Sequence, residues 1–307
     1  MEIIRSLDFR LNNSAVCIGK FDGIHKGHRL LLAEAEKGGF TTVMFTFVMD
    51  QRESLYSERE KMQLADRLGF DIFIAIPMDE RFMQQSAEDF VQDILLQRCG
   101  AKKVVVGEDF RFGHRRSGDA ELLLKMGKEY DFETVVRKKM VAGDDVISST
   151  RIRALIRKGE LDEANFLLGT PYFIAGRVQR GNQLGRKMET PTANICPHAG
   201  KDLPPYGVYA VLVEIEGKQY EGVANLGKKP TVAAKEPVGL EVWLFDYVGD
   251  LYDKEITVYL IQYQRAEHKF TSLEELKQQI ARDALQARQT LSLLDSGYLV
   301  RSFRHPD

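Results

Sequence analysis

The chain has 307 residues, 44% of them hydrophobic and 29% charged, with a formal net charge of −2 at pH 7. This composition is typical of a globular protein, and the length suits about two domains. The sequence contains no run of about 18 apolar residues, which excludes a transmembrane helix, and residues 1–10 lack the apolar core of a signal peptide.

The cysteine content and the charge balance indicate the cellular compartment and exclude some classes of partner. Cys17, Cys99 and Cys196 are too few and too far apart for a disulfide framework or a zinc site, so we expect a reducing compartment, the cytoplasm. Basic and acidic side chains nearly balance in both halves of the chain. We therefore expect neither nucleic acid nor a membrane as a main partner, although the basic cluster at 114–116 suits a small phosphate ligand.

The first half of the chain alternates short apolar runs with longer amphipathic segments. This alternation predicts an α/β domain with a parallel, Rossmann-like sheet covered by helices. Strands are expected at 15–18, 42–47, 72–76 and 104–106, and helices at 30–37, 58–68 and 87–98.

The second half is rich in short strands with polar turns, which predicts an antiparallel β-barrel. A turn at 214–219 is typical of a hairpin. We place the boundary after an Arg/Lys-rich helix that ends at Gly159, so that the domains are 1–169 and 170–307. Strands are expected at 172–178, 207–215, 220–225, 240–245 and 256–262.

A C-terminal helix follows the last predicted strand. Ser272 and Glu275 have the spacing of a capping box. Apolar residues then recur on one helical face, which we expect to pack on the barrel. These residues are Leu273, Leu276, Ile280, Ala284, Ala287, Leu291 and Leu294.

The most informative motif is the segment 19–28, which joins the first predicted strand to a helix. Its glycines Gly19, Gly23 and Gly27 let phosphate oxygens approach backbone N–H groups at a helix N-terminus. His25 and His28 can donate hydrogen bonds to a phosphoryl group as negative charge develops. Alone, the two histidines would more often be surface residues or an incomplete metal pair, but the whole segment after a strand favours a phosphate site.

Two further segments suit the same site. Residues 107–113 follow a predicted strand at the carboxyl edge, where open α/β sheets bind ligands. Residues 147–153 open a helix with hydroxyl side chains and two arginines, Arg151 and Arg153. By itself this second segment is more often a capped helix with a solvated face, whereas beside the histidine segment it can clamp a triphosphate.

A second candidate site lies in the barrel half. Thr192 and Asn194 are two residues apart in an extended segment, so both project to one side and can hold Mg²⁺ and phosphate. Taken alone, this segment is more often a plain strand start. Spaced glycines before it, Gly176, Gly181 and Gly185, suit a flexible phosphate flap.

Glu241 is the candidate general base of the second site. Alternation along 240–245 places it beside Trp243 and Phe245, on the face opposite Leu240, Val242 and Leu244. A carboxylate among aromatic side chains is a candidate base with a raised pKa, and a solvated glutamate is the alternative.

These segments, in this order along the whole chain, resemble bacterial bifunctional riboflavin kinase/FAD synthetases. His25 and His28 match the His-x-Gly-His signature of the nucleotidylyltransferase superfamily. The resemblance implies that ATP binds there and that FMN attacks its α-phosphorus, releasing pyrophosphate and forming FAD. It also implies a riboflavin-kinase barrel, in which Glu241 deprotonates the ribityl 5′-hydroxyl for attack on the γ-phosphate of ATP.

The resemblance further assigns binding residues, with Mg²⁺ as cofactor, ATP as co-substrate, riboflavin and FMN as substrates, and FMN and FAD as products. ATP and phosphate are assigned to Gly19, Phe21, Asp22, Gly23, Gly27, Ser149, Thr150, Arg153, Gly181, Gly185, Thr192 and Asn194, and Mg²⁺ to Thr192 and Asn194. The flavin is assigned to Asp109, Phe110 and Phe112.

The chain departs from the family pattern at three places. Met49, Asp50 and Gln51 stand where the family has a Pro-His-Pro turn, Glu189-Thr190 replace Gly-Phe, and Asp253 replaces a glycine. A carboxylate at position 50 is unfavourable near phosphates. The departures keep two alternatives open: a riboflavin kinase with weak or lost adenylyltransferase activity, and a catalytically degenerate flavin-binding regulatory protein.

Overall fold

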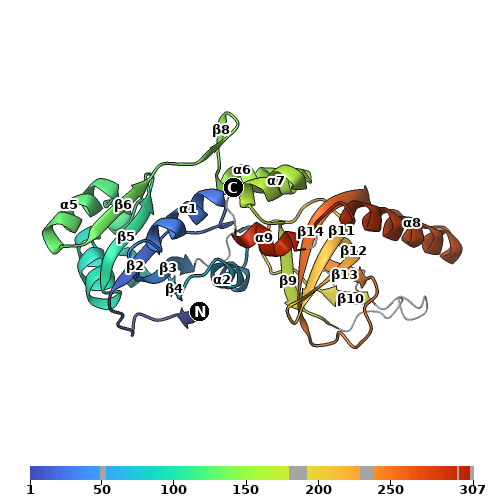
Figure 1. The fold of residues 1–307 in the computed structure, drawn as a ribbon, viewed down its shortest axis with the longest axis horizontal. Coiled ribbons are helices and arrows are strands. Elements are labelled where there is room, and N and C mark those ends of the chain that lie inside the picture. The colour runs from blue at the N-terminus through green and yellow to red at the C-terminus, as the bar shows by residue number, and fades with distance from the viewer. Residues whose placement is uncertain (49–52, 180–191, 229–237, 296, 305–307) are drawn as a thin grey trace. The chain divides into compact units, whose positions relative to one another are not determined.

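The computed structural model describes residues 1–48, 53–179, 192–228, 238–295 and 297–304 (Figure 1). Its contacts divide the chain into two compact units, which meet in the sequence between Ser149 and Thr150. We call them unit 1 and unit 2.

Unit 1 contains a six-stranded sheet with the order β1-β4-β3-β2-β5-β6, in which all paired strands are parallel. The strands are β1 (Glu2–Ile4), β2 (Ser14–Ile18), β3 (Thr41–Val48), β4 (Ile72–Pro77), β5 (Ala101–Gly107) and β6 (Glu133–Arg137). The helices are α1 (Lys26–Ala35), α2 (Glu58–Arg67), α3 (Glu80–Met83), α4 (Ala87–Asp89), the π-helix η1 (Phe90–Arg98), the 3₁₀ turn η2 (His114–Arg116) and α5 (Ala120–Tyr130), and a small hairpin is formed by β7 (Val141–Ala142) and β8 (Asp145–Val146).

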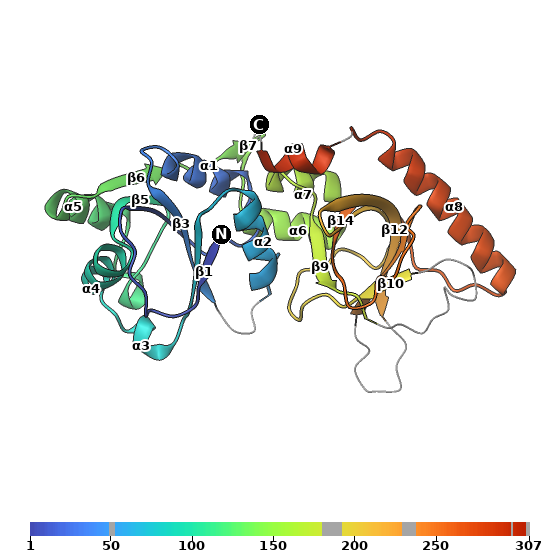
Figure 2. The ribbon, with the colours of Figure 1, turned by 60° about the horizontal axis from the view of Figure 1, so that its bottom comes forward.

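Helices cover both faces of this sheet (Figure 2). Val16 and Ile18 join a core that includes buried residues of η1 and α5. On the opposite face Cys17 contacts α1, where its Sγ lies 3.3 Å from the carbonyl oxygen of Leu31. Every residue of β2 is buried, which explains why this strand is a continuous apolar run rather than an alternating one.

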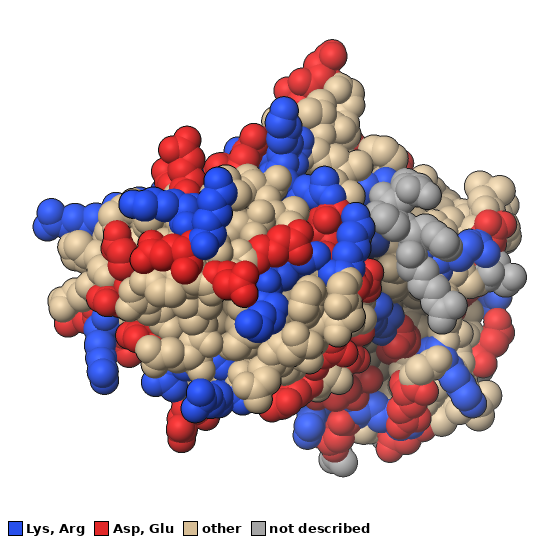
Figure 3. Space-filling model, turned by 60° about the vertical axis from the view of Figure 1, so that its left-hand side comes forward, with Lys and Arg blue, Asp and Glu red and all other residues tan. Residues whose placement is uncertain are grey.

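The predicted strands and helices of unit 1 are present, but α1 spans Lys26–Ala35 rather than 30–37, and one helix differs in type. The segment expected as one helix at 87–98 begins as α4 and continues as η1, where Cys99 N–H donates to the carbonyl of Ile94 at 2.8 Å, a π-helical bond. On the surface shown in Figure 3, acidic and basic side chains are interspersed, so no extended patch of one sign gathers on this face.

Unit 2 is built on a curled antiparallel half-barrel with the order β10-β13-β12-β11-β14-β9. A bridge between Gln179 and Asn194 connects the two ends of this sheet. Its strands are β9 (Phe173–Arg177), β10 (Thr192–Ile195), β11 (Gly207–Ile215), β12 (Lys218–Lys228), β13 (Val238–Leu244) and β14 (Glu255–Ala266), and its helices are α6 (Ser149–Lys158), α7 (Leu161–Leu168), α8 (Leu273–Leu291) and α9 (Tyr298–Arg304).

The hairpin between β11 and β12 is confirmed. Glu216 and Gly217 have φ of 50° and 77°, the left-handed conformation that a two-residue type I′ turn requires at both positions. Glycine adopts this conformation without a steric penalty. The turn sets the register of β11 and β12, in which Ile215 pairs with Lys218.

The C-terminal helix α8 packs on β11, β12 and β14. Ser272 Oγ accepts a hydrogen bond from Glu275 N–H at 3.1 Å, but the Glu275 carboxylate bonds to the N–H and hydroxyl of Thr271 rather than to Ser272. The first bond of the predicted capping box is therefore present, but the Glu275 carboxylate accepts from Thr271, one residue before the expected Ser272. Ala284, Ala287 and Leu291 are buried as expected, whereas Leu273 is exposed at the helix start.

The contact division differs from the expected boundary at 169/170 by the two helices α6 and α7. Asn165 of α7 donates from Nδ2 to the carbonyl of Leu260 in β14 at 3.2 Å and accepts from Tyr172 N–H at 2.7 Å. These bonds join α7 to the sheet of unit 2. The residues between 150 and 169 therefore belong by their contacts to unit 2.

Candidate active sites

The first site lies in the loop between β2 and α1, at the carboxyl end of a central strand of unit 1. Gly19 N–H donates to the carbonyl of Phe45 at 3.1 Å, which extends the pairing with β3. Phe21, Gly23 and Ile24 then have positive φ, of 45°, 97° and 39°. Such values are uncommon for non-glycine residues, and here the burial of the Phe21 and Ile24 side chains holds the loop in place.

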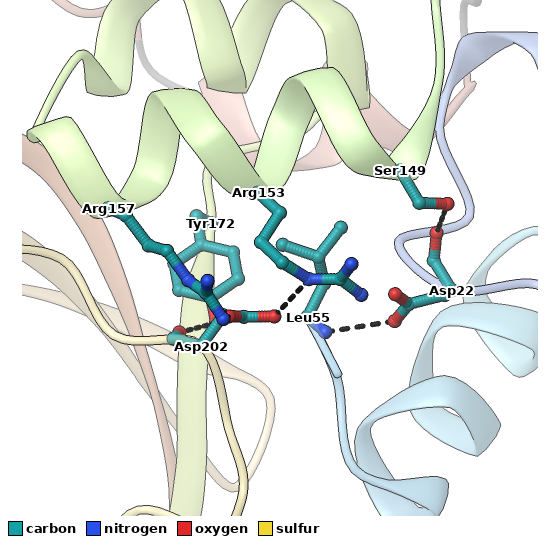
Figure 4. A network of polar contacts seen from close by, with 7 residues as sticks. All are labelled: Asp22, Leu55, Ser149, Arg153, Arg157, Tyr172 and Asp202. Atoms are coloured by element: carbon teal, nitrogen blue, oxygen red, sulfur yellow. Dashed lines mark hydrogen bonds and ion pairs between the residues drawn. The ribbon is translucent and has the colours of Figure 1, made fainter. Parts of the chain in front are cut away.

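Asp22 fixes this loop to other parts of unit 1 (Figure 4). Its Oδ1 accepts from Leu55 N–H at 2.9 Å, and its backbone carbonyl accepts from Ser149 Oγ at 2.5 Å. The structure therefore brings together two residues that were predicted to bind phosphate. The Asp22 carboxylate therefore holds the loop in place. It is not suited to contact a phosphate directly, because two negative charges would repel each other.

The two predicted catalytic histidines lie side by side at the start of α1. His25 is the N-cap residue, and its ring stacks on His28 with centroids 3.8 Å apart. The edge of Phe21 packs against His28, with centroids 5.1 Å apart. A Cβ at Gly27 would lie 3.2 Å from the His25 ring, so glycine at this position lets the imidazole lie close to the helix backbone.

Burial keeps both imidazoles uncharged. It lowers the pKa of His25 from 6.5 to about 4. The pKa of His28 lies well below its usual value because of burial first, and then because a proton on His28 would be repelled electrostatically by His25 and Lys61. Within the part of the chain that the structure describes, neither Nδ1 atom has a hydrogen-bond partner. The site thus presents, at a helix N-terminus, two neutral imidazoles whose Nδ1 atoms have no hydrogen-bond partner among the described residues.

Lys61 of α2 is a residue of this site that sequence reasoning missed. Its Nζ lies 3.4 Å from the carbonyl oxygen of Lys20, in the same loop. Burial lowers its pKa, while Asp22 and then Glu58 act in the opposite direction. No local motif marks this lysine, because the loop and α2 are 41 residues apart at this contact.

The remaining residues of the 149–153 motif belong to unit 2, where Arg153 binds a carboxylate. Its Nε donates to Asp202 Oδ2 at 2.6 Å, and Arg157 donates to Oδ1 of the same residue at 2.8 and 2.5 Å (Figure 4). Asp202 is buried, and its carbonyl accepts from the Tyr172 hydroxyl. A phosphate contact by Arg153 or Thr150 therefore stays a prediction.

The predicted flavin residues follow β5. Phe110 and Phe112 stack with centroids 5.5 Å apart, but Phe112 is buried in the core of unit 1, so Phe110 is the half-buried partner of the pair. Asp109 is exposed and pairs with Lys139, Nζ to Oδ2, at 2.9 Å. The structure thus brings Phe110 and Phe112 together and turns Asp109 toward a lysine that the sequence did not single out.

The second site is set by strand register in unit 2. Glu241 of β13 pairs directly with Asn194 of β10 and with Asn225 of β12. Thr192 Oγ1 donates to Glu241 Oε1 at 2.8 Å. Cross-strand partners project to the same face, so these four side chains share one face of the sheet. The predicted alternation is confirmed, because Leu240, Val242 and Leu244 are all buried on the opposite face.

The donor set of the second site fits Mg²⁺ in type. The two residues assigned to the metal both carry oxygen atoms, Thr192 a hydroxyl and Asn194 an amide oxygen, and oxygen donors are the ligands that Mg²⁺ prefers. No cluster of three or more His, Cys, Asp or Glu side chains suited to a metal occurs among the described residues. Mg²⁺ usually takes only one or two protein ligands together with substrate phosphates, so such a cluster is not required.

Several predicted residues lie outside the described ranges, namely Gly181, Gly185 and the departures at 49–51 and 189–190. The third departure is described. Asp253 has φ of 64°, in the left-handed region that glycine enters freely. Aspartate is among the non-glycine residues that tolerate this region best, so it can stand where the family resemblance leads us to expect glycine.

Together these sites define a class of protein: an enzyme that joins a parallel α/β domain, with a glycine-histidine loop at a helix N-terminus, to an antiparallel half-barrel with an oxygen-rich face. Two family models match the chain, FAD synthetase over residues 9–151 and riboflavin kinase over residues 168–291. Each match contains one of the two sites.

Similar proteins extend this result to nearly the whole chain. The sequence is 39% identical over 290 residues to the bifunctional riboflavin kinase/FMN adenylyltransferase of Escherichia coli (strain K12), covering 90% of this chain and 92% of that protein. It is 37% identical over 304 residues to the protein of the same name from Pseudomonas fluorescens, covering 94% and 97%. The chain belongs to the family of bifunctional riboflavin kinase/FMN adenylyltransferases.

A solved structure shares the fold. The crystal structure titled macrolide-efflux protein from Streptococcus pneumoniae has a TM-score of 0.77 and 30% identity, covering 96% of this chain and 99% of that one. Among the described residues of the present chain, no helix is both long and apolar enough to cross a membrane.

The buried imidazole of His25 predicts a pH-dependent stability. Between about pH 6.5 and 4 the unfolded chain binds a proton that the folded chain does not, so stability falls as the pH drops through this range. The loss amounts to at most about 3 kcal/mol. Thermal unfolding at pH 7 and pH 5 should show a smaller drop in Tm for His25→Asn than for the unchanged protein. The exposed control His198→Asn should keep the full drop, and equal drops in all three proteins would contradict the assignment.

Proposed function

We propose that the chain phosphorylates riboflavin to FMN at the Glu241 site of unit 2 and adenylylates FMN to FAD at the His25–His28 site of unit 1, with ATP as co-substrate in both reactions. The observation that carries this proposal is that each of the two family matches contains one of the two polar sites. We also propose a cytoplasmic location, in keeping with the three scattered cysteines.

In the kinase reaction, Glu241 accepts the proton of the ribityl 5′-hydroxyl as that oxygen attacks the γ-phosphorus of ATP. The hydrogen bond from Thr192 holds Oε1 of the carboxylate, so Oε2 is the oxygen that takes the proton. Thr192 and Asn194 are the residues that would hold Mg²⁺, which when bound neutralises phosphate charge.

In the adenylyltransferase reaction, an oxygen of the FMN phosphate attacks the α-phosphorus of ATP and pyrophosphate leaves. The neutral imidazoles of His25 and His28 each donate one hydrogen bond to the phosphoryl oxygens as charge develops. Backbone N–H groups at the start of α1 supply further donors, which Gly19, Gly23 and Gly27 leave accessible. Because the imidazoles are uncharged, the positive charge that balances the phosphates comes from other groups such as Lys61.

A kinase without adenylyltransferase activity is the second candidate, favoured by the replacement of the family Pro-His-Pro turn by Met49-Asp50-Gln51. Incubation with riboflavin, ATP and Mg²⁺, followed by chromatography of the flavins, separates the possibilities. The proposed enzyme forms FMN and then FAD. The kinase alone stops at FMN, and a flavin-binding regulator forms neither product.

Replacing Glu241 by glutamine should separate the two activities. Glu241→Gln keeps the size of the side chain and its bond to Thr192 but removes the base, so FMN formation should fall by roughly two to four orders of magnitude. FAD formation from supplied FMN should persist, because that site lies in the other unit. Normal riboflavin phosphorylation by this variant, measured by product chromatography, would show that Glu241 is not the base.

His28→Ala should affect turnover more than ATP binding. Backbone N–H groups supply much of the phosphate binding, whereas the imidazole acts mainly on the transition state, so kcat for FAD formation should fall roughly 10²- to 10³-fold with little change in the KM for ATP. The control His198→Ala removes an exposed imidazole that belongs to neither proposed site and should leave the kinetics of FAD formation unchanged. An equal loss of binding and turnover in His28→Ala would count against the proposed role.

A further inference from the structure

A second carboxylate lies on the same face of the half-barrel as Glu241. Glu267 follows the end of β14, and its Oε1 accepts a hydrogen bond from Asn225 Nδ2 at 3.2 Å. A side chain at Gly227 would overlap this carboxylate, so the glycine leaves room for it. Asn225 pairs with Glu241, and Gly227 lies two residues further along the same strand, which places both on the Glu241 face.

The bond to Glu267 fixes the orientation of the Asn225 amide. A carboxylate can only accept hydrogen bonds, so the NH₂ group of Asn225 must face Glu267 and the carbonyl Oδ1 must face away. Within the described ranges Oδ1 has no protein partner. Glu241 and Glu267 are exposed and Asn225 is half-buried, so a ligand can reach this oxygen.

The backbone next to Glu267 is fixed by contacts of Arg265 with helix α8. Arg265 donates to the buried carboxylate of Asp283 through two bonds, at 2.9 and 2.5 Å, and its guanidinium lies 5.8 Å from the centre of the Phe270 ring. Glu267 stands between these two anchored residues. Its carboxylate is therefore placed by the end of the strand and not by a long unsupported loop.

The two sides of Glu241 differ in hydrogen-bonding character. Toward β10 lie the hydroxyl of Thr192 and the amide of Asn194, which were assigned to metal and phosphate. Toward β12 lie the oriented Oδ1 of Asn225 and the Glu267 carboxylate, both acceptors. Acceptors and negative charge repel a phosphate but suit a substrate that brings hydroxyl donors, so the β12 side of Glu241 faces the alcohol substrate.

We propose that Asn225 and Glu267 recognise the polyol chain of the kinase substrate. Asn225 Oδ1 accepts a hydrogen bond from one secondary hydroxyl of the ribityl chain. Glu267 is a positioning residue that orients the Asn225 amide. This inference rests on the proposed riboflavin kinase activity and names the part of the substrate that the β12 side recognises. A site that pairs with a substrate hydroxyl discriminates against an analogue without it, because the acceptor is then left unpaired.

The test compares riboflavin with the analogues that lack a single secondary ribityl hydroxyl, in the unchanged protein, Asn225→Ala and Glu267→Gln. In the unchanged protein, one of the deoxy analogues should lose about tenfold in kcat/KM relative to riboflavin. In Asn225→Ala that penalty should disappear. In Glu267→Gln it should shrink, mainly through a higher KM for riboflavin with kcat kept within a few-fold, because a glutamine amide can turn Asn225 around.

Matched control variants distinguish a loss of Asn225 positioning from a general loss of structure or activity. Glu274→Gln makes the same chemical change on an exposed glutamate in the first turn of α8 and should leave the discrimination intact. FAD formation from FMN should be unchanged in every variant. If Asn225→Ala does not fold, Asn225→Ser keeps a small polar side chain too short to occupy the Oδ1 position and serves instead.

Two results would overturn the proposal. Undiminished discrimination in Asn225→Ala would show that Asn225 does not contact the polyol, and a loss of kcat by orders of magnitude in Glu267→Gln would make Glu267 the base. Quenching of flavin fluorescence gives the same comparison as binding constants, without turnover. If the unchanged protein binds the flavins with this discrimination but forms no FMN, the proposed kinase activity fails while the polyol contact stands.

Discussion

Strand register in the half-barrel is the constraint on which the kinase site depends. Glu241 belongs to a strand whose alternate residues are fully buried, so a slip of one residue would move its carboxylate into the apolar interior and expose Leu240 or Val242. An unpaired carboxylate in such an interior is strongly unfavourable. The apolar alternation of β13 therefore determines which face of the sheet carries the Glu241 carboxylate. With it, the pairings to Asn194 and Asn225 place the proposed metal-binding side and the proposed hydroxyl-binding side on either side of Glu241, the proposed base.

Unit 1 meets a different constraint, because its site is a loop in unfavourable backbone conformations. Phe21 and Ile24 have positive φ, and the burial of their side chains, together with the bonds to Asp22, compensates for this strain. The same burial keeps the imidazoles of His25 and His28 neutral. Two neutral rings can stack without repulsion and still donate hydrogen bonds, which suits a site that must stabilise charge developing on a phosphoryl group.

The sequence predicted the central strands well and the long-range contacts poorly. Strands such as β2 and β11 are almost completely buried, so their sequences are nearly continuous apolar runs that are easy to recognise. The edge strands β1, β6 and β10 are short or partly exposed, so their sequences show little apolar pattern. The histidine pair and Glu241 could be found because local motifs mark them. The Arg153 contact with Asp202, the Asn225 contact with Glu267 and the place of Lys61 join residues more than 40 positions apart, and no local pattern encodes them.

In the proposed function, two chemistries occupy two separate sites of one chain, so that FMN made at one site can be used at the other. Mixing Glu241→Gln with His28→Ala tests this arrangement most directly, because one variant lacks the proposed kinase base and the other lacks a proposed adenylyltransferase donor. With riboflavin, ATP and Mg²⁺, we expect each variant alone to form little or no FAD and the mixture to form FAD at a rate well above the sum of the two. A mixture that forms no more FAD than the separate variants would contradict the account.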